Sequence, residues 1–154
     1  GIIRNTIFKQ FVGGETLEET ADVGRQLSEF GVDVILDYGV EGKEGEANFE
    51  YATQEFIRVI EYAGKQQNIP FVSVKVTGLA RFALLQKLNE APRLRSGIHA
   101  NEAENEEWDR VCDRMYRICE AAANANVAVL VDAEESWIQD PIDALAYEMM
   151  AKYN

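Results

Sequence analysis

The sequence contains few of the residues that build metal centres and disulfide frameworks: one histidine and two cysteines among 154 residues. A single histidine, and no Cys-x-x-Cys pair, argue against a zinc site. Cys112 and Cys119 are seven residues apart in a segment with helical periodicity, which separates them by about 10 Å along the helix axis. That distance is too long for a disulfide, so we expect both cysteines to act as small buried apolar side chains.

Long apolar runs and positive charge are also scarce. No run approaches the roughly 20 apolar residues that cross a bilayer, and no basic segment followed by an apolar one opens the chain. The 15 Lys and Arg residues are outnumbered by 27 Asp and Glu residues, which gives a net charge of −12. This balance repels a phosphate backbone and an anionic bilayer surface. We therefore expect no nucleic-acid partner, a cytoplasmic location, and at most peripheral contact with an inner membrane.

What the chain does contain is a regular alternation of short apolar runs and helical patterns. The apolar runs predict strands over 6–12, 32–36, 71–76 and 127–131. The helical patterns predict five helices. The first runs from Thr16 to Gly31, the second covers 47–63, and a short third helix contains Leu79 to Leu88. A long fourth helix has an apolar stripe from Trp108 to Ala122, and Asp140 caps the last helix.

Four βα units with apolar strands predict an α/β fold with a parallel sheet. Two architectures fit: half of a (β/α)₈ barrel, which typically needs about 250 residues, or a small open parallel three-layer sheet. The chain begins at Gly1, without an initiator methionine, and reaches Asn154 directly from a helical pattern. We therefore expect residues 1–154 to be the amino-terminal half of a barrel domain and a fragment of a longer chain.

In parallel α/β sheets, functional groups gather where the strands end, because loops and helix starts converge there. The polar residues at the predicted carboxyl ends are Glu15, Asp37, Tyr38, Lys75, Asp132, Glu134 and Glu135. Lys75 is the most informative, since desolvating an unpaired charge in an apolar strand costs several kcal/mol. Its predicted partner is Asp132 or an anionic substrate.

Several roles remain open for these residues. Lys75 and Asp132 could form an ion pair with no catalytic use, or Lys75 could be a Schiff-base nucleophile of a lyase or aldolase. The acidic residues after the last strand could bind a divalent metal together with Asp37, or orient a proton transfer. For Glu134 and Glu135, a further interpretation is stabilisation of the following helix start. Gly13-Gly14 lacks a third glycine at dinucleotide spacing, and no Gly-Lys-Ser/Thr occurs, so neither a Rossmann fingerprint nor a P-loop is present.

Four strings, IFKQFVGGET, ILDYGVEGKE, FVSVKVTGLARF and VLVDAEESWIQDPIDAL, together resemble the amino-terminal half of the catalytic domain of the proline dehydrogenase family. The resemblance implies a distorted (β/α)₈ barrel that binds FAD noncovalently, oxidises L-proline to Δ1-pyrroline-5-carboxylate and passes electrons to a quinone. It implies that Lys75 binds the proline carboxylate and that Asp132 is the active-site aspartate. It also places Ala133 beside the flavin, and Glu15 in an ion pair that closes the site. No metal is implied.

The chain departs from the family pattern because it ends after the fourth βα unit. The adjacent arginines that clamp the substrate belong to later units of the family, and no two basic residues are adjacent here. The residues that distinguish proline from hydroxyproline are expected there as well. A third hypothesis is therefore an inactive half-barrel that forms a homo-oligomer through its exposed strand edges.

Overall fold

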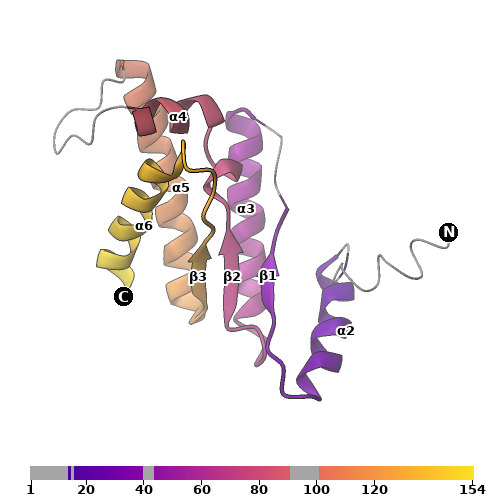
Figure 1. The fold of residues 1–154 in the computed structure, drawn as a ribbon. Coiled ribbons are helices and arrows are strands. Elements are labelled where there is room, and N and C mark those ends of the chain that lie inside the picture. Colours follow the sequence, from indigo (N-terminus) through magenta and orange to yellow (C-terminus); the bar gives the residue numbers. More distant parts are fainter. Residues whose placement is uncertain (1–13, 15, 40–43, 91–100) are drawn as a thin grey trace.

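A computed structural model describes residues 14, 16–39, 44–90 and 101–154 of the chain. In chain order, the elements are α2 (Leu17–Ser28), β1 (Ile35–Asp37), α3 (Glu46–Ala63), β2 (Phe71–Val74), the 3₁₀ helix η2 (Val76–Gly78), α4 (Phe82–Glu90), α5 (Glu102–Ala125), β3 (Ala128–Val131) and α6 (Gln139–Tyr153) (Figure 1). The predicted α/β class is confirmed. The strand predicted over 6–12 lies outside the described residues.

The described strands form one parallel sheet in the order β1-β2-β3. Each strand therefore pairs with the next strand along the chain, and a helix lies in each connection. Figure 1 shows α3 and α5 side by side behind the sheet, with α6 following beside α5 and α2 set apart beyond β1. Sequential parallel strands with their helices in one layer are the arrangement of a barrel. The described part is consistent with a portion of a (β/α)₈ barrel.

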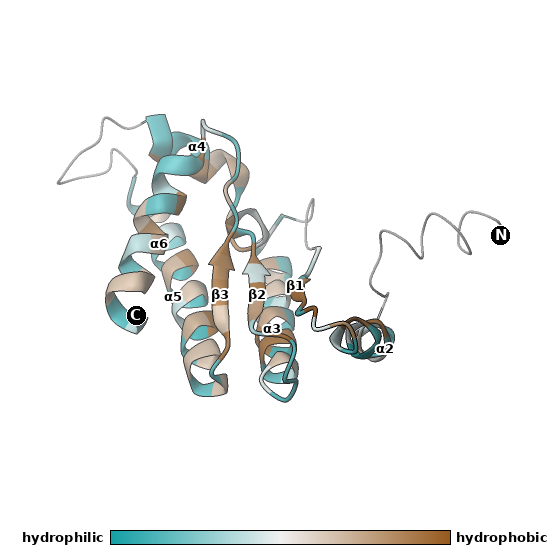
Figure 2. Cartoon of the chain, turned by 60° about the horizontal axis from the view of Figure 1, so that its bottom comes forward, coloured by the Kyte–Doolittle hydropathy of each residue, from teal (hydrophilic) through white to brown (hydrophobic). Residues whose placement is uncertain are grey.

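The core lies between the sheet and the helix layer. Alternation along β2 directs Val72 and Val74 toward the helices, where both are fully buried beside Phe56 and Ile60 of α3 and Met115 of α5. Figure 2 shows the strands as the most hydrophobic part of the chain and the helices as mixed. Among the described helices, none is both long enough and apolar enough to span a membrane.

All three described strands are shorter than the sequence predicts, and β3 (Ala128–Val131) loses only its first residue. β1 starts at Ile35 because the preceding residues are bound elsewhere: Val32 N donates to Leu27 O at the end of α2, at 3.1 Å. β2 stops at Val74 because Gly78 N donates to Lys75 O at 3.0 Å, which turns the chain into η2. Lys75 therefore lies one residue beyond the strand.

The predicted N-cap of the last helix is wrong. α6 begins two residues earlier, with Ile138 as its N-cap residue and no capping side-chain hydrogen bond. Ile138 is fully buried, and the Asp140 N–H donates to Asn89 Oδ1 of α4 at 2.8 Å. Packing against α4 therefore fixes the start of this helix. By contrast, Thr16 caps α2 as predicted, because its Oγ1 accepts from Glu19 N at 3.2 Å.

The two cysteines behave as predicted. Both are free, Cys119 buried and Cys112 half-buried on α5. Burial raises the thiol pKa to about 11 for Cys119 and to about 12 for Cys112. At neutral pH both are therefore protonated, unreactive apolar side chains.

The buried face of α5 contains a charged residue that the apolar stripe does not predict. Arg114 is only 4% exposed. Its Nη1 donates to Leu79 O at 3.0 Å, its Nη2 pairs with Glu46 of α3, and its guanidinium lies 5.5 Å from the ring centroid of Phe49. This arginine joins α5 to α3, through Glu46 and Phe49, and to the segment after β2, through the Leu79 carbonyl.

Candidate functional site

The register of the sheet brings three charged residues to one edge and one face. Asp37 is paired with Ser73 across β1 and β2, and Asp132 N donates to Val74 O at 3.0 Å. Because side chains alternate along a strand, Asp37, Ser73, Lys75 and Asp132 all point away from the helix layer. The carboxyl ends of the three strands thus share one polar cluster, which we call the Lys75 cluster.

Lys75 lies at the centre of this cluster. Its Nζ is 2.5 Å from Asp132 Oδ2 and 3.3 Å from Asp37 Oδ2, and its side chain is 18% exposed. The hydrogen bond to Asp132 is the main cause of a raised lysine pKa, and the hydrogen bond to Asp37 adds to it. Lys75 is therefore firmly protonated. The predicted proximity of Lys75 and Asp132 is confirmed, although their roles toward a substrate stay predictions.

Asp132 is bound through both of its carboxylate oxygens. Ser73 Oγ donates to Oδ1 at 2.6 Å, while Lys75 holds Oδ2. The hydrogen bond from Lys75 is the main cause of a lowered Asp132 pKa, and the hydrogen bond from Ser73 adds to it. The carboxylate is therefore ionised at neutral pH. Ser73 is not among the residues predicted from the sequence, although its place two residues before Lys75, on the same strand face, is a usable signal.

Tyr38 follows Asp37 in sequence but does not join the cluster. Its ring packs edge-on against Phe56 of α3, with centroids 5.8 Å apart and planes at 87°. Alternation explains the difference, since Asp37 points to the open face and the next side chain points to the helices. Partial burial raises the Tyr38 pKa, so the phenol stays protonated.

The residues after Asp132 form the loop that leads into α6. Ala133 is exposed, directly beside the cluster. Glu134 Oε1 accepts from Thr77 Oγ1 at 2.8 Å, and Glu134 N donates to Gln139 Oε1 at 2.7 Å. Glu134 thus fixes the loop after β3 to η2. Because α6 begins at Gln139, neither Glu134 nor Glu135 lies in its first turn, and the helix-start interpretation is wrong.

Two further predictions have different outcomes. Glu15, expected in a site-closing ion pair, lies outside the described residues. The metal hypothesis finds no support in the part of the chain that the structure describes, where no group of three or more His, Cys, Asp or Glu side chains could hold an ion.

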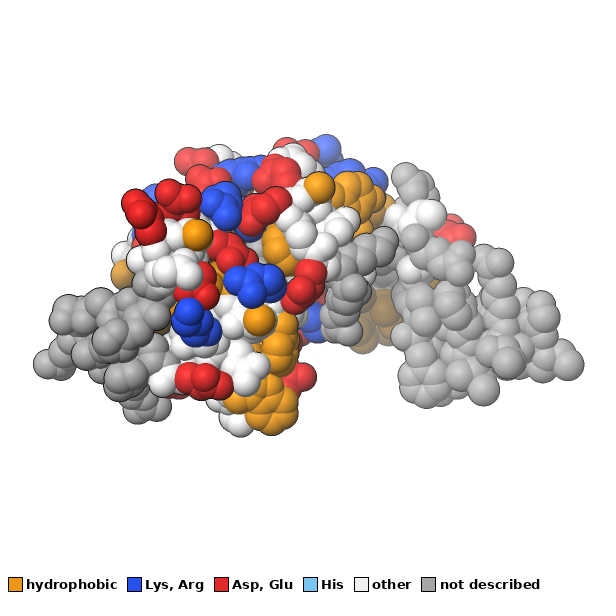
Figure 3. Space-filling model, turned by 90° about the horizontal axis from the view of Figure 1, so that it is seen from above, with side chains coloured by type: hydrophobic (Ala, Val, Ile, Leu, Met, Phe, Trp, Pro, Cys, Tyr) orange, Lys and Arg blue, Asp and Glu red, His pale blue; other side chains and the backbone are white. Residues whose placement is uncertain are grey.

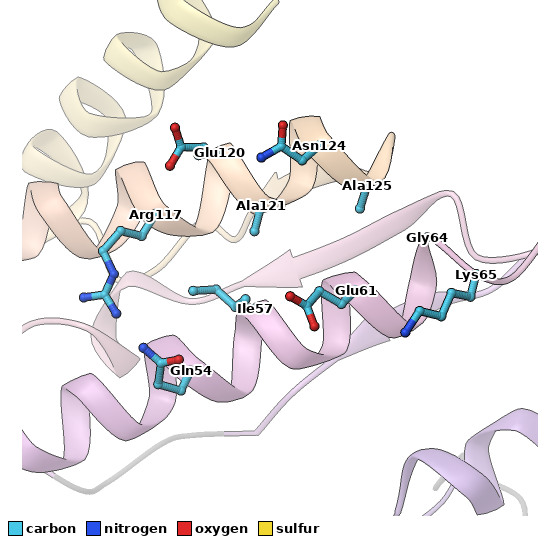
Figure 4. Close-up of a pocket in the computed structure, with 10 residues that line it drawn as sticks. All are labelled: Gln54, Ile57, Glu61, Gly64, Lys65, Arg117, Glu120, Ala121, Asn124 and Ala125. Carbon is cyan, nitrogen blue, oxygen red and sulfur yellow. The ribbon is translucent and has the colours of Figure 1, made fainter.

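A separate groove lies on the outer side of the helix layer, between α3 and α5 (Figure 4). It encloses about 650 Å³ and is lined by Gln54, Ile57, Glu61, Gly64, Lys65, Arg117, Glu120, Ala121, Asn124 and Ala125. The two helices approach closely at one end, where a Cβ on Gly64 would lie 2.8 Å from Ala125 O. That end adjoins the start of β2 and β3, away from the Lys75 cluster. The groove is therefore a surface feature of helix packing, distinct from the candidate site.

The surface around the carboxyl edge is charged but mixed in sign. Figure 3, a view onto this end of the molecule, shows basic and acidic side chains interspersed. Arg81 pairs with Glu107 at 2.8 Å, and Lys87 pairs with Glu104 at 2.7 Å, so α4 is tied to the first turns of α5. These pairs hold α4 against α5 near the site.

Sequential parallel βα units with charged side chains at the carboxyl edge of the sheet are typical of part of a (β/α)₈ barrel. Comparison with known proteins identifies the family. The family model described as proline dehydrogenase matches residues 20–154. The chain belongs to the proline dehydrogenase family.

Individual relatives agree with this assignment. The chain is 34% identical over 144 residues to the carbapenem antibiotics biosynthesis protein CarD of Pectobacterium carotovorum subsp. carotovorum, covering 94% of this chain and 37% of the relative. It is 27% identical over 183 residues to the mitochondrial proline dehydrogenase 1 of Dictyostelium discoideum, covering 99% and 32%. It is also 27% identical over 186 residues to proline dehydrogenase 1 of Arabidopsis thaliana, covering 100% and 37%. The chain thus spans about a third of the length of these relatives.

Proposed function

We propose that the protein containing this chain oxidises L-proline to Δ1-pyrroline-5-carboxylate, with noncovalently bound FAD as the hydride acceptor and a quinone as the final electron acceptor. The observation that carries the proposal is the Lys75–Asp132 pair at the carboxyl edge of a proline dehydrogenase family sheet. Family membership supports the reaction class, and the geometry supports the assignment of roles.

Lys75 binds the substrate carboxylate in this proposal. Its ammonium offers three hydrogen-bond donors, and the neighbouring carboxylates keep it charged. A carboxylate docked on Nζ fixes one end of the amino acid and leaves the ring free to lie beside the cluster. The lysine therefore positions the substrate and does not react with it.

Asp132 provides negative charge where the reaction develops positive charge. Loss of a hydride from the ring carbon next to nitrogen leaves a C=N cation, and a fixed carboxylate nearby stabilises that charge. The two short hydrogen bonds from Ser73 and Lys75 hold the carboxylate in one orientation. Its lowered pKa keeps it ionised throughout.

Ala133 is the residue beside the flavin in this proposal, as the family resemblance implies. It is exposed and adjoins Asp132, and its small side chain is compatible with a planar ring close to the backbone. FAD, when bound there, supplies the two-electron acceptor that the reaction needs. The chain's own residues would hold the substrate and its charge against that ring.

The lyase hypothesis is less well supported. A Schiff-base lysine needs a neutral amine, which requires a lowered pKa. Hydrogen bonds from Lys75 to Asp132 and Asp37 raise the pKa instead. Lys75 is thus better suited to bind an anion than to attack a carbonyl.

The first test uses the complete protein and rapid mixing with L-proline, with hydroxyproline in parallel. We expect proline to bleach the visible flavin band, and Asp132→Asn to slow this reduction by about 100-fold, a typical cost for a lost transition-state electrostatic contact. Asp143→Asn, an exposed aspartate of α6, removes the same charge and serves as the control. A colourless protein, or equal rates for Asp132→Asn and wild type, contradicts the proposal.

A further inference from the structure

The two carboxylates of the Lys75 cluster are held very differently. Asp132 is bound through both oxygens, at 2.5 Å to Lys75 and 2.6 Å to Ser73, and is 36% exposed. Asp37 contacts Lys75 at 3.3 and 3.4 Å, and it is 54% exposed. Releasing Asp132 breaks two short hydrogen bonds, whereas releasing Asp37, which is already more than half exposed, breaks only the longer contacts to Lys75.

The charge of the cluster sets a condition on substrate binding. One ammonium and two carboxylates sum to −1, so a third carboxylate on Lys75 would meet like charge within a few ångströms. Lys75 is largely covered, and both aspartates accept hydrogen bonds from its ammonium. A substrate carboxylate therefore binds at lowest cost when one of the two aspartates leaves the lysine.

We propose that Asp37 is an intramolecular competitor for the Lys75 ammonium, which the carboxylate of an amino-acid substrate displaces while Asp132 remains bound. Binding is then an exchange of counter-ions on one lysine. The inference rests on the proposed role of Lys75 as the carboxylate-binding residue. It assigns Asp37 to the control of substrate affinity, and not to the chemical step.

The test is the variant Asp37→Asn in the complete protein, which keeps the shape of the side chain and removes the competing charge. We expect the KM for proline to fall about two- to fivefold, the size of an exposed charge interaction, with kcat unchanged. The advantage should shrink at high salt, where the Asp37 charge is screened in wild type. A merely structural ion pair predicts the opposite sign, because its loss would loosen Lys75 and weaken binding.

A second measurement separates this inference from the proposed function. Reductive methylation of Lys75, quantified by mass spectrometry, reports its occupancy without requiring flavin or turnover. Cyclopentanecarboxylate should protect Lys75 at about two- to fivefold lower concentration in Asp37→Asn than in wild type. Asp33→Asn, which removes an exposed charge before β1, is the matched control. It should change neither the KM for proline nor the cyclopentanecarboxylate concentration that protects Lys75.

The outcomes are distinct. Absence of proline-dependent flavin reduction in wild type overturns the proposed function, while stronger carboxylate protection in Asp37→Asn still supports the exchange. Unchanged or weaker protection in Asp37→Asn overturns the inference, even if wild type oxidises proline.

Discussion

Among the basic side chains that bridge neighbouring elements of this molecule, Arg114 and Lys75 lie in opposite surroundings. Arg114 lies inside the helix layer, where its partners are the Leu79 carbonyl, Glu46 and the Phe49 ring. Lys75 lies on the open face of the sheet, between two carboxylates that are accessible to solvent. The first contact stabilises the fold. The second leaves an ammonium partly exposed at the carboxyl edge of the sheet, whereas the Arg114 guanidinium is covered on all sides.

The largest effect should follow removal of the exposed-face cation. Lys75→Met keeps the aliphatic stem and deletes the charge, and we expect the KM for proline to rise about 10- to 100-fold, since charge-assisted hydrogen bonds to a ligand are worth about 1.5–3 kcal/mol. Steady-state kinetics of the complete protein measure this change. Lys87→Met, outside the cluster, should leave the KM unaltered. An unchanged KM in Lys75→Met would remove the lysine from the binding site.

The helix-layer cation should instead control stability. Arg114→Met leaves the buried Leu79 carbonyl without its donor, and we expect a loss of about 2 kcal/mol in the free energy of unfolding. Urea unfolding followed by circular dichroism measures the loss. Arg110 also pairs with Glu46, but at 3.3 Å and 48% exposed, so Arg110→Met should cost less than about 0.5 kcal/mol. If Arg114→Met and Arg110→Met lost the same free energy of unfolding, burial of the arginine would not decide how much its contacts contribute to stability.

The smallest effect concerns the pH dependence of an ion pair between α3 and α5. The hydrogen bonds from Arg117 lower the Glu50 pKa to about 2. A depressed pKa contributes stability above the unfolded value of about 4.3, and this stability is lost as the pH falls toward 2. Glu50 is 47% exposed, so solvent screening limits the contribution to less than about 1 kcal/mol.

Glu50→Gln tests this point. The variant should be less stable than wild type at pH 7, and the difference should narrow as the pH is lowered from about 5 to 2. Unfolding curves at several pH values measure the difference, with Glu120→Gln on the exposed face of α5 as the control. If the difference in stability between Glu50→Gln and wild type stayed constant with pH, ionisation of Glu50 would not contribute to the free energy of unfolding.

The sequence predicted the Lys75–Asp132 pair for a clear reason. Apolar strands that end in charged residues leave those residues at one edge of a parallel sheet, and the alternation of side chains puts them on one face. The same rule, applied one residue further, would have excluded Tyr38 from the site, because the side chain after Asp37 faces the helices. Ser73 required knowledge of the register, which places it diagonally across from Asp132.

Other features could not be found from local patterns. The apolar stripe of α5 predicts which face of the helix is buried, but it does not predict that Arg114 is buried on that face. The burial of this arginine depends on an acceptor 35 residues away and on a carboxylate 68 residues away. The start of α6 is similar, since Asn89 and the buried Ile138 override the capping preference of Asp140. Local propensity is weaker than the packing of a fully buried side chain.

The order of the described strands and helices, their parallel pairing and the charged residues at the strand ends follow from the amino-acid sequence, because hydrophobic periodicity and side-chain alternation are local properties. Contacts in the folded chain were needed to show which carboxylate holds Lys75 tightly, which holds it loosely, and which arginine is buried. These outcomes depend on hydrogen-bond distances and solvent exposure between segments far apart in the chain, and no local pattern of residues encodes such distances.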